Sequence, residues 1–305
     1  MLVQLKNLTK SFGSQTVLDK INLTVNEKDR LGIVGVNGAG KTTTMKMLLG
    51  LTAPTSGTVS LFGRPLKGNE KRVLPRIGSL IESPGFYPNL TGTENLQIFA
   101  RLRGLKSPNY IKGALELVNL PYRDKKRYAQ YSLGMKQRLG VAQALLHNPK
   151  IMILDEPTNG LDPAGIKEFR DLLRHLAHQR GLSVMVSSHI LQEMQLMCDT
   201  VGIINNGELL RVGTIEELSR LNTGNIYRYS LRPMEDAVRL AQQHLSDRLV
   251  GVGPDFIDLH IAEEEVGNVN CRFMENGITI YGLAAQGNSL EQIFMSITGG
   301  GNVVE

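Results

Sequence analysis

The residues with the clearest chemical potential in this sequence form a glycine-rich loop that ends in a lysine and two threonines. Residues 35–42 satisfy the pattern G-x-x-x-x-G-K-[ST] in full. Glycines let the backbone curve so that several N–H groups point at phosphate oxygens, and a helix that follows offers its positive end to the same anion. Lys41 would contact the β and γ phosphates of ATP, and the Thr42 hydroxyl would bind Mg²⁺. The residues expected to line this site are Gly35, Asn37, Gly38, Ala39, Gly40, Lys41, Thr42 and Thr43.

Two carboxylates follow the apolar run at residues 151–154 and suit the second half of the same site. Asp155 and Glu156 would stand at the carboxyl edge of a buried strand, where ligands of open α/β sheets bind. Asp155 is expected to hold Mg²⁺ through water, and Glu156 to polarise the attacking water as a general base. Adjacent strand residues face opposite ways, so both can serve only if the strand ends and turns there. Pro157 supplies the expected break.

The hydrophobic pattern predicts the elements that position these groups. The run 31–34 enters the glycine loop, and a helical pattern follows the loop, which gives a strand, a loop and a helix in sequence. The runs 151–154 and 183–186 lack polar alternation, as strands covered on both faces of a parallel sheet do. Residues 2–8 and 21–25 predict an additional antiparallel β layer. The expected fold class is therefore α/β with a mostly parallel sheet.

Two regions depart from this pattern. Apolar residues at helical spacing predict a mostly helical insertion over residues 90–149. After residue 221 apolar and polar residues alternate, which is typical of half-buried strands, and the pattern at 290–297 is helical. We therefore expect one domain at residues 1–220 and a small α+β domain at 221–305.

The composition excludes several classes of protein. The 305 residues are 41% hydrophobic and 21% charged, as in ordinary globular proteins, and the length leaves room for two domains. The net charge of +5 forms no arm of one sign, so an anionic ligand or a membrane surface is compatible and no nucleic acid is expected.

Cys198 and Cys271 form no metal-binding or disulfide pattern, which fits a reduced cytosol. No window approaches the roughly 18 consecutive apolar residues of a spanning helix, so a partner chain would have to cross the membrane.

These motifs resemble those of the ATP-binding subunits of ABC transporters over about residues 2–220. The resemblance implies a P-loop NTPase core of the ABC ATPase type, with residues 90–149 as its helical subdomain and 221–305 as an accessory domain. It further implies ATP hydrolysis with Mg²⁺, a second copy of the chain that completes the site, and integral membrane permease subunits as partners. The chain would be cytoplasmic and peripheral on the inner face of the membrane, and residues 82–96 would contact the permease.

Five positions acquire expected roles through this resemblance. Phe12 lies where an aromatic residue stacks on adenine, with a core aromatic as the alternative role. In the signature motif, Ser132 and Gly134 would approach the γ-phosphate bound by the second copy. Asp162 belongs to the loop that joins the two sites. His189 matches the switch histidine, a catalytic contact to the γ-phosphate, with a helix cap as the alternative role.

Two departures from the family pattern narrow the resemblance. Leu133 and Met135 replace a glycine and a glutamine of the signature, and Glu82 stands where most relatives have glutamine. A carboxylate at this place would still bind Mg²⁺ or water beside the triphosphate. Both variants, with the carboxy-terminal domain, resemble the bacitracin and lantibiotic self-protection exporters. This resemblance implies that the chain powers the export of a peptide antibiotic.

Two other classes of protein share the glycine loop. A soluble ABC ATPase that acts on ribosomes or DNA usually carries two cassettes or a long coiled coil, and the sequence shows neither. A small-molecule kinase would leave the signature and His189 without a purpose. The residues determine neither the cargo nor the number of permease types.

Overall fold

The chain folds into two compact units. The computed structural model describes residues 1–82, 85–220, 225–286 and 294. Clustering of contacts separates Met1–Thr214 from Ile215–Glu305. The short helix α8 (Ile215–Arg220) falls within the second unit, although the sequence placed these residues at the end of the first domain.

A six-stranded sheet forms the centre of the first unit. Its strands, in spatial order, are β10 (Glu208–Thr214), β9 (Thr200–Asn205), β3 (Arg30–Val34), β8 (Ser183–Ser188), β7 (Ile151–Asp155) and β6 (Ile77–Leu80). Every neighbouring pair is parallel except β9 with the edge strand β10. Every residue of β7 and β8 is buried, which explains why these strands lack polar alternation. The predicted mostly parallel sheet is confirmed.

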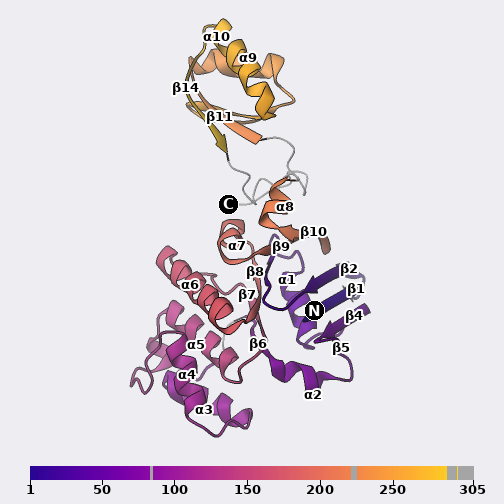
Figure 1. Cartoon of the computed structure of the whole chain (residues 1–305), viewed down its shortest axis with the longest axis vertical. Helices are drawn as coiled ribbons and strands as arrows, with labels where there is room; N and C mark the ends of the chain where they lie inside the picture. The colour runs from indigo at the N-terminus through magenta and orange to yellow at the C-terminus, as the bar shows by residue number, and fades with distance from the viewer. Residues whose placement is uncertain (83–84, 221–224, 287–293, 295–305) are drawn as a thin grey trace. The chain divides into compact units, whose positions relative to one another are not determined.

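A four-stranded antiparallel sheet packs against one side of the central sheet, with helix α1 (Lys41–Leu48) between them (Figure 1). Its strands, in spatial order, are β2 (Gln15–Val25), β1 (Val3–Phe12), β4 (Ser56–Leu61) and β5 (Arg64–Pro65). The α1 side chains Met45, Met47 and Leu48 are 0% exposed and share one core with residues of both sheets. This packing fixes the helix that follows the glycine loop.

Three helices pack on the opposite side of the central sheet, α5 (Leu133–Leu145), α6 (Pro163–Arg180) and α7 (Leu191–Met197) (Figure 1). Two more, α3 (Gly92–Leu102) and α4 (Asn109–Leu117), pack against α5 and against each other. Three shorter segments are α2 (Glu70–Val73), η1 (Leu74–Arg76) and η2 (Tyr128–Gln130). Helix α3 begins at a capping box, in which the Thr91 hydroxyl accepts from the Glu94 N–H and the Glu94 carboxylate accepts from the Thr91 N–H. Among the described residues, no helix has both the length and the apolar character needed to cross a membrane.

The second unit contains a four-stranded antiparallel sheet with two helices on one face. In chain order its elements are β11 (Asn225–Arg232), α9 (Met234–His244), β12 (Leu249–Val252), β13 (Phe256–Ile261), η3 (Glu263–Glu265), α10 (Val266–Glu275) and β14 (Thr279–Gln286). The strand order β12-β13-β11-β14 and this β-α-β-β-α-β succession define a ferredoxin-like arrangement. The expected α+β character is confirmed. The helix expected at residues 290–297 lies outside the described residues, apart from Phe294.

Substitution of Phe273 tests which contacts stabilise the second unit. Its side chain is 0% exposed, and its ring centroid lies 5.4 Å from that of Tyr229 on the sheet. We expect Phe273→Ala to lower the free energy of unfolding of this unit by about 3–5 kcal/mol, because a large cavity replaces the ring. Hydrogen exchange of the β11–β14 amides in the full chain measures the effect. The neighbouring control Met274→Ala removes a side chain that is 67% exposed, and equal losses for both variants would contradict the packing described.

Candidate active site

The glycine loop lies between β3 and α1, and its backbone requires glycine at two closely packed positions. Gly40 precedes the helix with φ of 108°, in the left-handed region. A Cβ atom on Gly40 would lie 2.3 Å from the Leu18 side chain, and one on Gly35 would lie 2.3 Å from the Ile204 carbonyl oxygen. The loop is therefore pressed against β2 and β9, so its curvature is held by the surrounding sheets.

Lys41 is a buried cation with three acceptors around its ammonium group. Its side chain is 5% exposed. Nζ donates to the Gly35 carbonyl oxygen at 2.8 Å and to the Val36 carbonyl oxygen at 3.2 Å. Nζ also lies 3.2 Å from Oε1 of Glu156. The ammonium group thus joins the glycine loop to the residue that follows β7.

Asp155, at the end of β7, accepts hydrogen bonds from two hydroxyl groups. The Thr42 hydroxyl donates to Oδ2 at 2.8 Å, and the Ser187 hydroxyl donates to Oδ1 at 2.6 Å. Asp155 lies opposite Ser187 in the parallel register of β7 and β8. The two residues expected at the Mg²⁺ site, Thr42 and Asp155, therefore lie in direct contact, and their roles toward the metal stay predictions. Ser187 was not predicted from the sequence.

Glu156 turns the chain immediately after β7. Its φ is 46°, so the strand ends in a left-handed residue and Glu156 no longer follows the strand alternation. The predicted turn is confirmed, but it occurs at Glu156 itself and precedes Pro157. The Glu156 N–H donates to the Ser187 hydroxyl at 3.0 Å, and Oε2 lies 2.8 Å from Nδ1 of His189. The three predicted catalytic residues, Lys41, Glu156 and His189, therefore form one connected group.

The oxygen atoms of Thr42 and Asp155 suit Mg²⁺. Magnesium is usually held in nucleotide sites by one or two protein oxygens together with phosphate oxygens and water. The two side chains lie within hydrogen-bond distance of each other at the mouth of the glycine loop. Within the described ranges, no group of three or more His, Cys, Asp and Glu side chains is placed to hold a metal alone. A metal here would therefore depend on the triphosphate for its remaining ligands.

A cavity of about 260 Å³ opens beside Lys41. It is lined by Val17, Asn37, Gly38, Gly40, Lys41, Thr42, Thr43 and Glu156. Gly35 and Ala39, also expected at the site, are buried behind this surface. Phe12 does not line the cavity; its side chain is 54% exposed and the Lys10 ammonium lies 4.6 Å from its ring centroid. The stacking role of Phe12 stays a prediction, and Val17 is a lining residue that no motif indicated.

Glu82 is engaged by a lysine of helix α1. Its Oε1 lies 2.7 Å from Nζ of Lys46, and this ion pair holds the pKa of the Glu82 carboxyl below its usual value. Lys46 stands one helical turn after Thr42, so Glu82 is placed beside the helix that starts at the phosphate loop. Its predicted contact with Mg²⁺ stays a prediction, because the structure pairs it with Lys46.

The signature and joining-loop residues lie at the starts of two other helices. Ser132 caps α5, where its hydroxyl accepts from the Met135 N–H at 3.3 Å, and Gly134 lies in the first turn of the same helix. Asp162 caps α6, where its carboxylate accepts from the Gly165 N–H at 3.0 Å. None of these three residues lines the cavity at Lys41. Their expected contact with a nucleotide bound by a second copy stays a prediction.

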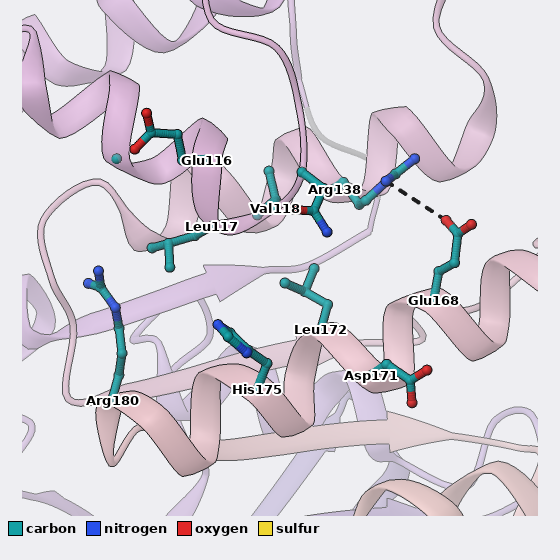
Figure 2. A pocket seen from close by; sticks show the side chains of 11 residues that line it. Glu116, Leu117, Val118, Arg138, Glu168, Asp171, Leu172, His175 and Arg180 are labelled. Carbon is teal, nitrogen blue, oxygen red and sulfur yellow. Dashed lines mark ion pairs between the residues drawn. The ribbon is translucent and has the colours of Figure 1, made fainter.

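A second hollow, of about 650 Å³, lies between α4, α5 and α6 (Figure 2). Arg138 on α5 is ion-paired with Glu168 on α6 at 3.8 Å, and Figure 2 shows this pair at one end of the hollow. His175 and Arg180 line it from α6, and Glu116 from α4. No glycine-loop residue contributes to it. The hollow is therefore separate from the nucleotide site, although the ion pair joins the two helices that begin at Ser132 and Asp162.

Comparison with known proteins agrees with this geometry. Residues 18–159 match a family model described as ABC transporter. A bacitracin transport ATP-binding protein of Bacillus licheniformis is 44% identical over 303 residues, 99% of each chain. One of Enterococcus faecalis is 42% identical over 99% of this chain and 98% of the relative. A lantibiotic transport ATP-binding protein of Streptococcus pyogenes is 41% identical over 209 residues, 68% of this chain and 89% of the relative.

Solved structures show the same fold. The ATP-binding subunit of an ABC transporter superimposes with a TM-score of 0.65 and 30% identity over 72% of this chain and 93% of its own. An ATP-binding cassette solved as a dimer with ADP and Pi superimposes with a TM-score of 0.62 and 26% identity, over 70% of this chain and 99% of its own. The glycine loop, the Asp155–Glu156 pair and His189 stand in the order of such a cassette. The chain belongs to the ATP-binding proteins of the ABC transporter family, and it is an ATPase by class.

Substitution of Ser187 tests how the catalytic carboxylates are positioned. Ser187→Ala removes both the donor to Asp155 and the acceptor of the Glu156 N–H. We expect kcat for ATP hydrolysis to fall about tenfold, roughly 1.4 kcal/mol of barrier, with a smaller change in KM, because the phosphate contacts of the loop are untouched. Ser183→Ala is the matched control, since Ser183 is also buried but lies at the opposite end of β8. Equal ATPase kinetics for the two variants would show that Ser187 has no positioning role.

Proposed function

We propose that this chain hydrolyses ATP to power the export of a bacitracin-type or lantibiotic-type peptide antibiotic. The observation that supports this most strongly is the identity of 44% over nearly the whole length with a bacitracin transport protein, the carboxy-terminal unit included. A lantibiotic transport protein is also similar over the cassette. The relatives named for transport do not favour the alternative of a soluble ATPase acting on ribosomes or DNA.

In this proposal the loop amides and the Lys41 ammonium hold the β and γ phosphates. Thr42 would hold Mg²⁺ directly and Asp155 would hold it through water, and the metal would offset phosphate charge in the reaction. Glu156 accepts a proton from the attacking water, and its carboxylate is well placed because the turn at φ 46° directs it toward Lys41 and His189. His189 would contact the γ-phosphate. Of these side chains, Lys41, Thr42 and Glu156 line one cavity, while Asp155 is hydrogen-bonded to Thr42 and His189 contacts Glu156.

The working unit in this proposal is a homodimer with ATP between the two copies. Dimeric cassettes are known among the similar structures. A single chain places Ser132 and Gly134 away from its own phosphate loop, so a second copy would bring them to the γ-phosphate. ATP would then join the two copies, and hydrolysis would remove the contacts that favour the closed state.

The permease contact is proposed at the segment that links the nucleotide site to the helices, residues 82–96. Residues 83 and 84 of this segment lie outside the described residues. In the remainder, buried Asn95 accepts from the Tyr87 N–H at 2.8 Å and donates to the Tyr87 carbonyl oxygen at 3.1 Å. These bonds hold a turn that leaves the Tyr87 ring 56% exposed. The chain would thereby lie at the inner face of the membrane as a peripheral subunit.

The roles of Lys41 and Glu156 can be separated by two substitutions. Glu156→Gln keeps the shape of the side chain but removes the base, so we expect ATP binding to persist while kcat falls about 10²- to 10⁴-fold. Lys41→Ala should instead weaken the affinity for ATP with Mg²⁺, because it removes the phosphate cation. Fluorescent ATP titration and phosphate release measure the two quantities. Turnover of Glu156→Gln at the rate of the parent protein would remove Glu156 from the mechanism.

Antibiotic susceptibility tests the proposed cargo. Expression of the chain with its permease in a bacitracin-sensitive bacterium should raise the inhibitory concentration of bacitracin or of a lantibiotic. The Glu156→Gln variant is the matched control, and it should give no protection at equal expression. Equal susceptibility of cells with the active and inactive variants, toward both antibiotic classes, would contradict this cargo and leave the ATPase assignment intact.

A further inference from the structure

The excess of positive over negative charge lies in the helical segment of the chain. Residues 90–149 contain ten Lys and Arg against three Asp and Glu, a net charge of +7. Since the whole chain carries +5, the remaining residues carry −2. The segment is no arm of one sign, since it includes three carboxylates, but its charge is strongly positive on balance. A segment with a net positive charge attracts anionic partners.

One part of this charge surrounds the turn between α3 and α4. Arg103 caps the end of α3, and Gly104 closes the turn with φ of 71°. Arg101, Arg103 and Lys106 are exposed, and within the described part of the chain none of the three forms an ion pair with a carboxylate. The three cations are therefore available to an anionic partner.

Apolar surface accompanies these cations. Leu102, between the two arginines, is 78% exposed, and Tyr110 at the start of α4 is 46% exposed. A hollow of about 450 Å³ lies at the same turn. It is lined by Gln97, Ala100, Arg101, Gly104, Leu105, Lys106, Ser107, Pro108 and Ile111. Cations at the rim of a hollow with apolar walls, beside an exposed leucine, suit a partner that is both anionic and apolar.

We propose that the α3–α4 turn, residues 101–110, docks on the anionic phospholipid surface of the membrane. This inference rests on the proposed function, which places the chain at a membrane through its permease. The headgroup phosphates pair with Arg101, Arg103 and Lys106, while Leu102 enters the interface beside them. Each basic residue near an anionic leaflet contributes about 1 kcal/mol, so the turn adds a second attachment beside the permease contact.

Co-sedimentation of the purified full chain with protein-free vesicles tests this docking. Vesicles of phosphatidylglycerol mixed with phosphatidylcholine are compared with vesicles of phosphatidylcholine alone, at low and at high salt. We expect binding to the anionic vesicles only, and loss of most of it at high salt, because the contact is largely electrostatic. Absence of binding to anionic vesicles at low salt overturns the proposal.

Two triple variants of equal charge locate the contact. Replacing Arg101, Arg103 and Lys106 with alanine should lower the partition coefficient between water and anionic vesicles on the order of 100-fold. Each residue contributes a factor of about five, and the three factors multiply. Replacing the exposed Arg64, Lys67 and Lys71 with alanine removes the same charge from β5, α2 and the connection between them, and should have a much smaller effect. Equal binding of the two variants overturns the assignment of the site.

Two further readouts separate this proposal from its rivals. Both triple variants should bind ATP as the parent protein does, which would show that they are folded. If Lys41→Ala bound ATP as tightly as the parent protein, that result would count against the proposed function and would leave the vesicle result unchanged. The triple alanine variant of Arg101, Arg103 and Lys106 could instead bind vesicles normally and no longer co-purify with the permease. That result would show that the turn docks on protein, and the lipid proposal would be wrong.

Discussion

A buried ammonium group is the constraint around which the cassette is arranged. Lys41 is 5% exposed, and a cation removed from water is stable only with acceptors close to it. The loop supplies the carbonyl oxygens of Gly35 and Val36, and the end of β7 supplies the Glu156 carboxylate. The curvature of the loop, the place where β7 ends and the left-handed turn at Glu156 are therefore parts of one arrangement. Phosphate oxygens can enter the same shell because they are acceptors of the same kind.

The two sheets hold this arrangement rigidly. Helix α1 is enclosed by them through fully buried methionines, so the positive end of the helix cannot move away from the loop. Parallel pairing places the carboxyl ends of β3, β7 and β8 at one edge, which brings Ser187 opposite Asp155. The Ser187 hydroxyl then positions two neighbouring residues, because it donates to the Asp155 carboxylate and accepts from the Glu156 N–H. The chemistry of the site thus depends on strand register as much as on the motif residues.

The residues proposed to contact a second copy lie on other parts of the cassette. Ser132 and Asp162 begin α5 and α6, and the Arg138–Glu168 pair joins those helices away from the phosphate loop. This ion pair, at 3.8 Å with Glu168 largely exposed, contributes little to stability. The basic turn at residues 101–110 belongs to the same helical layer. The proposed contacts with a second copy and with the membrane therefore use other surfaces of the first unit than the nucleotide site does.

The sequence alone determined the phosphate loop, the buried strand before Asp155, the mostly parallel sheet and the α+β character of the second unit. These features are local, because glycine freedom, the Lys-Thr pair and the alternation of apolar residues act over a few neighbours. Only the tertiary structure decided that Ser187 supports Asp155, that Glu82 pairs with Lys46, that Val17 lines the cavity and that Phe12 does not. These four features depend on strand register or on the packing of distant segments. Strand register and distant packing leave no pattern along the sequence. The cations at the α3–α4 turn are different, because they lie within six consecutive residues of the sequence, and only their exposure and their lack of ion pairs come from the tertiary structure.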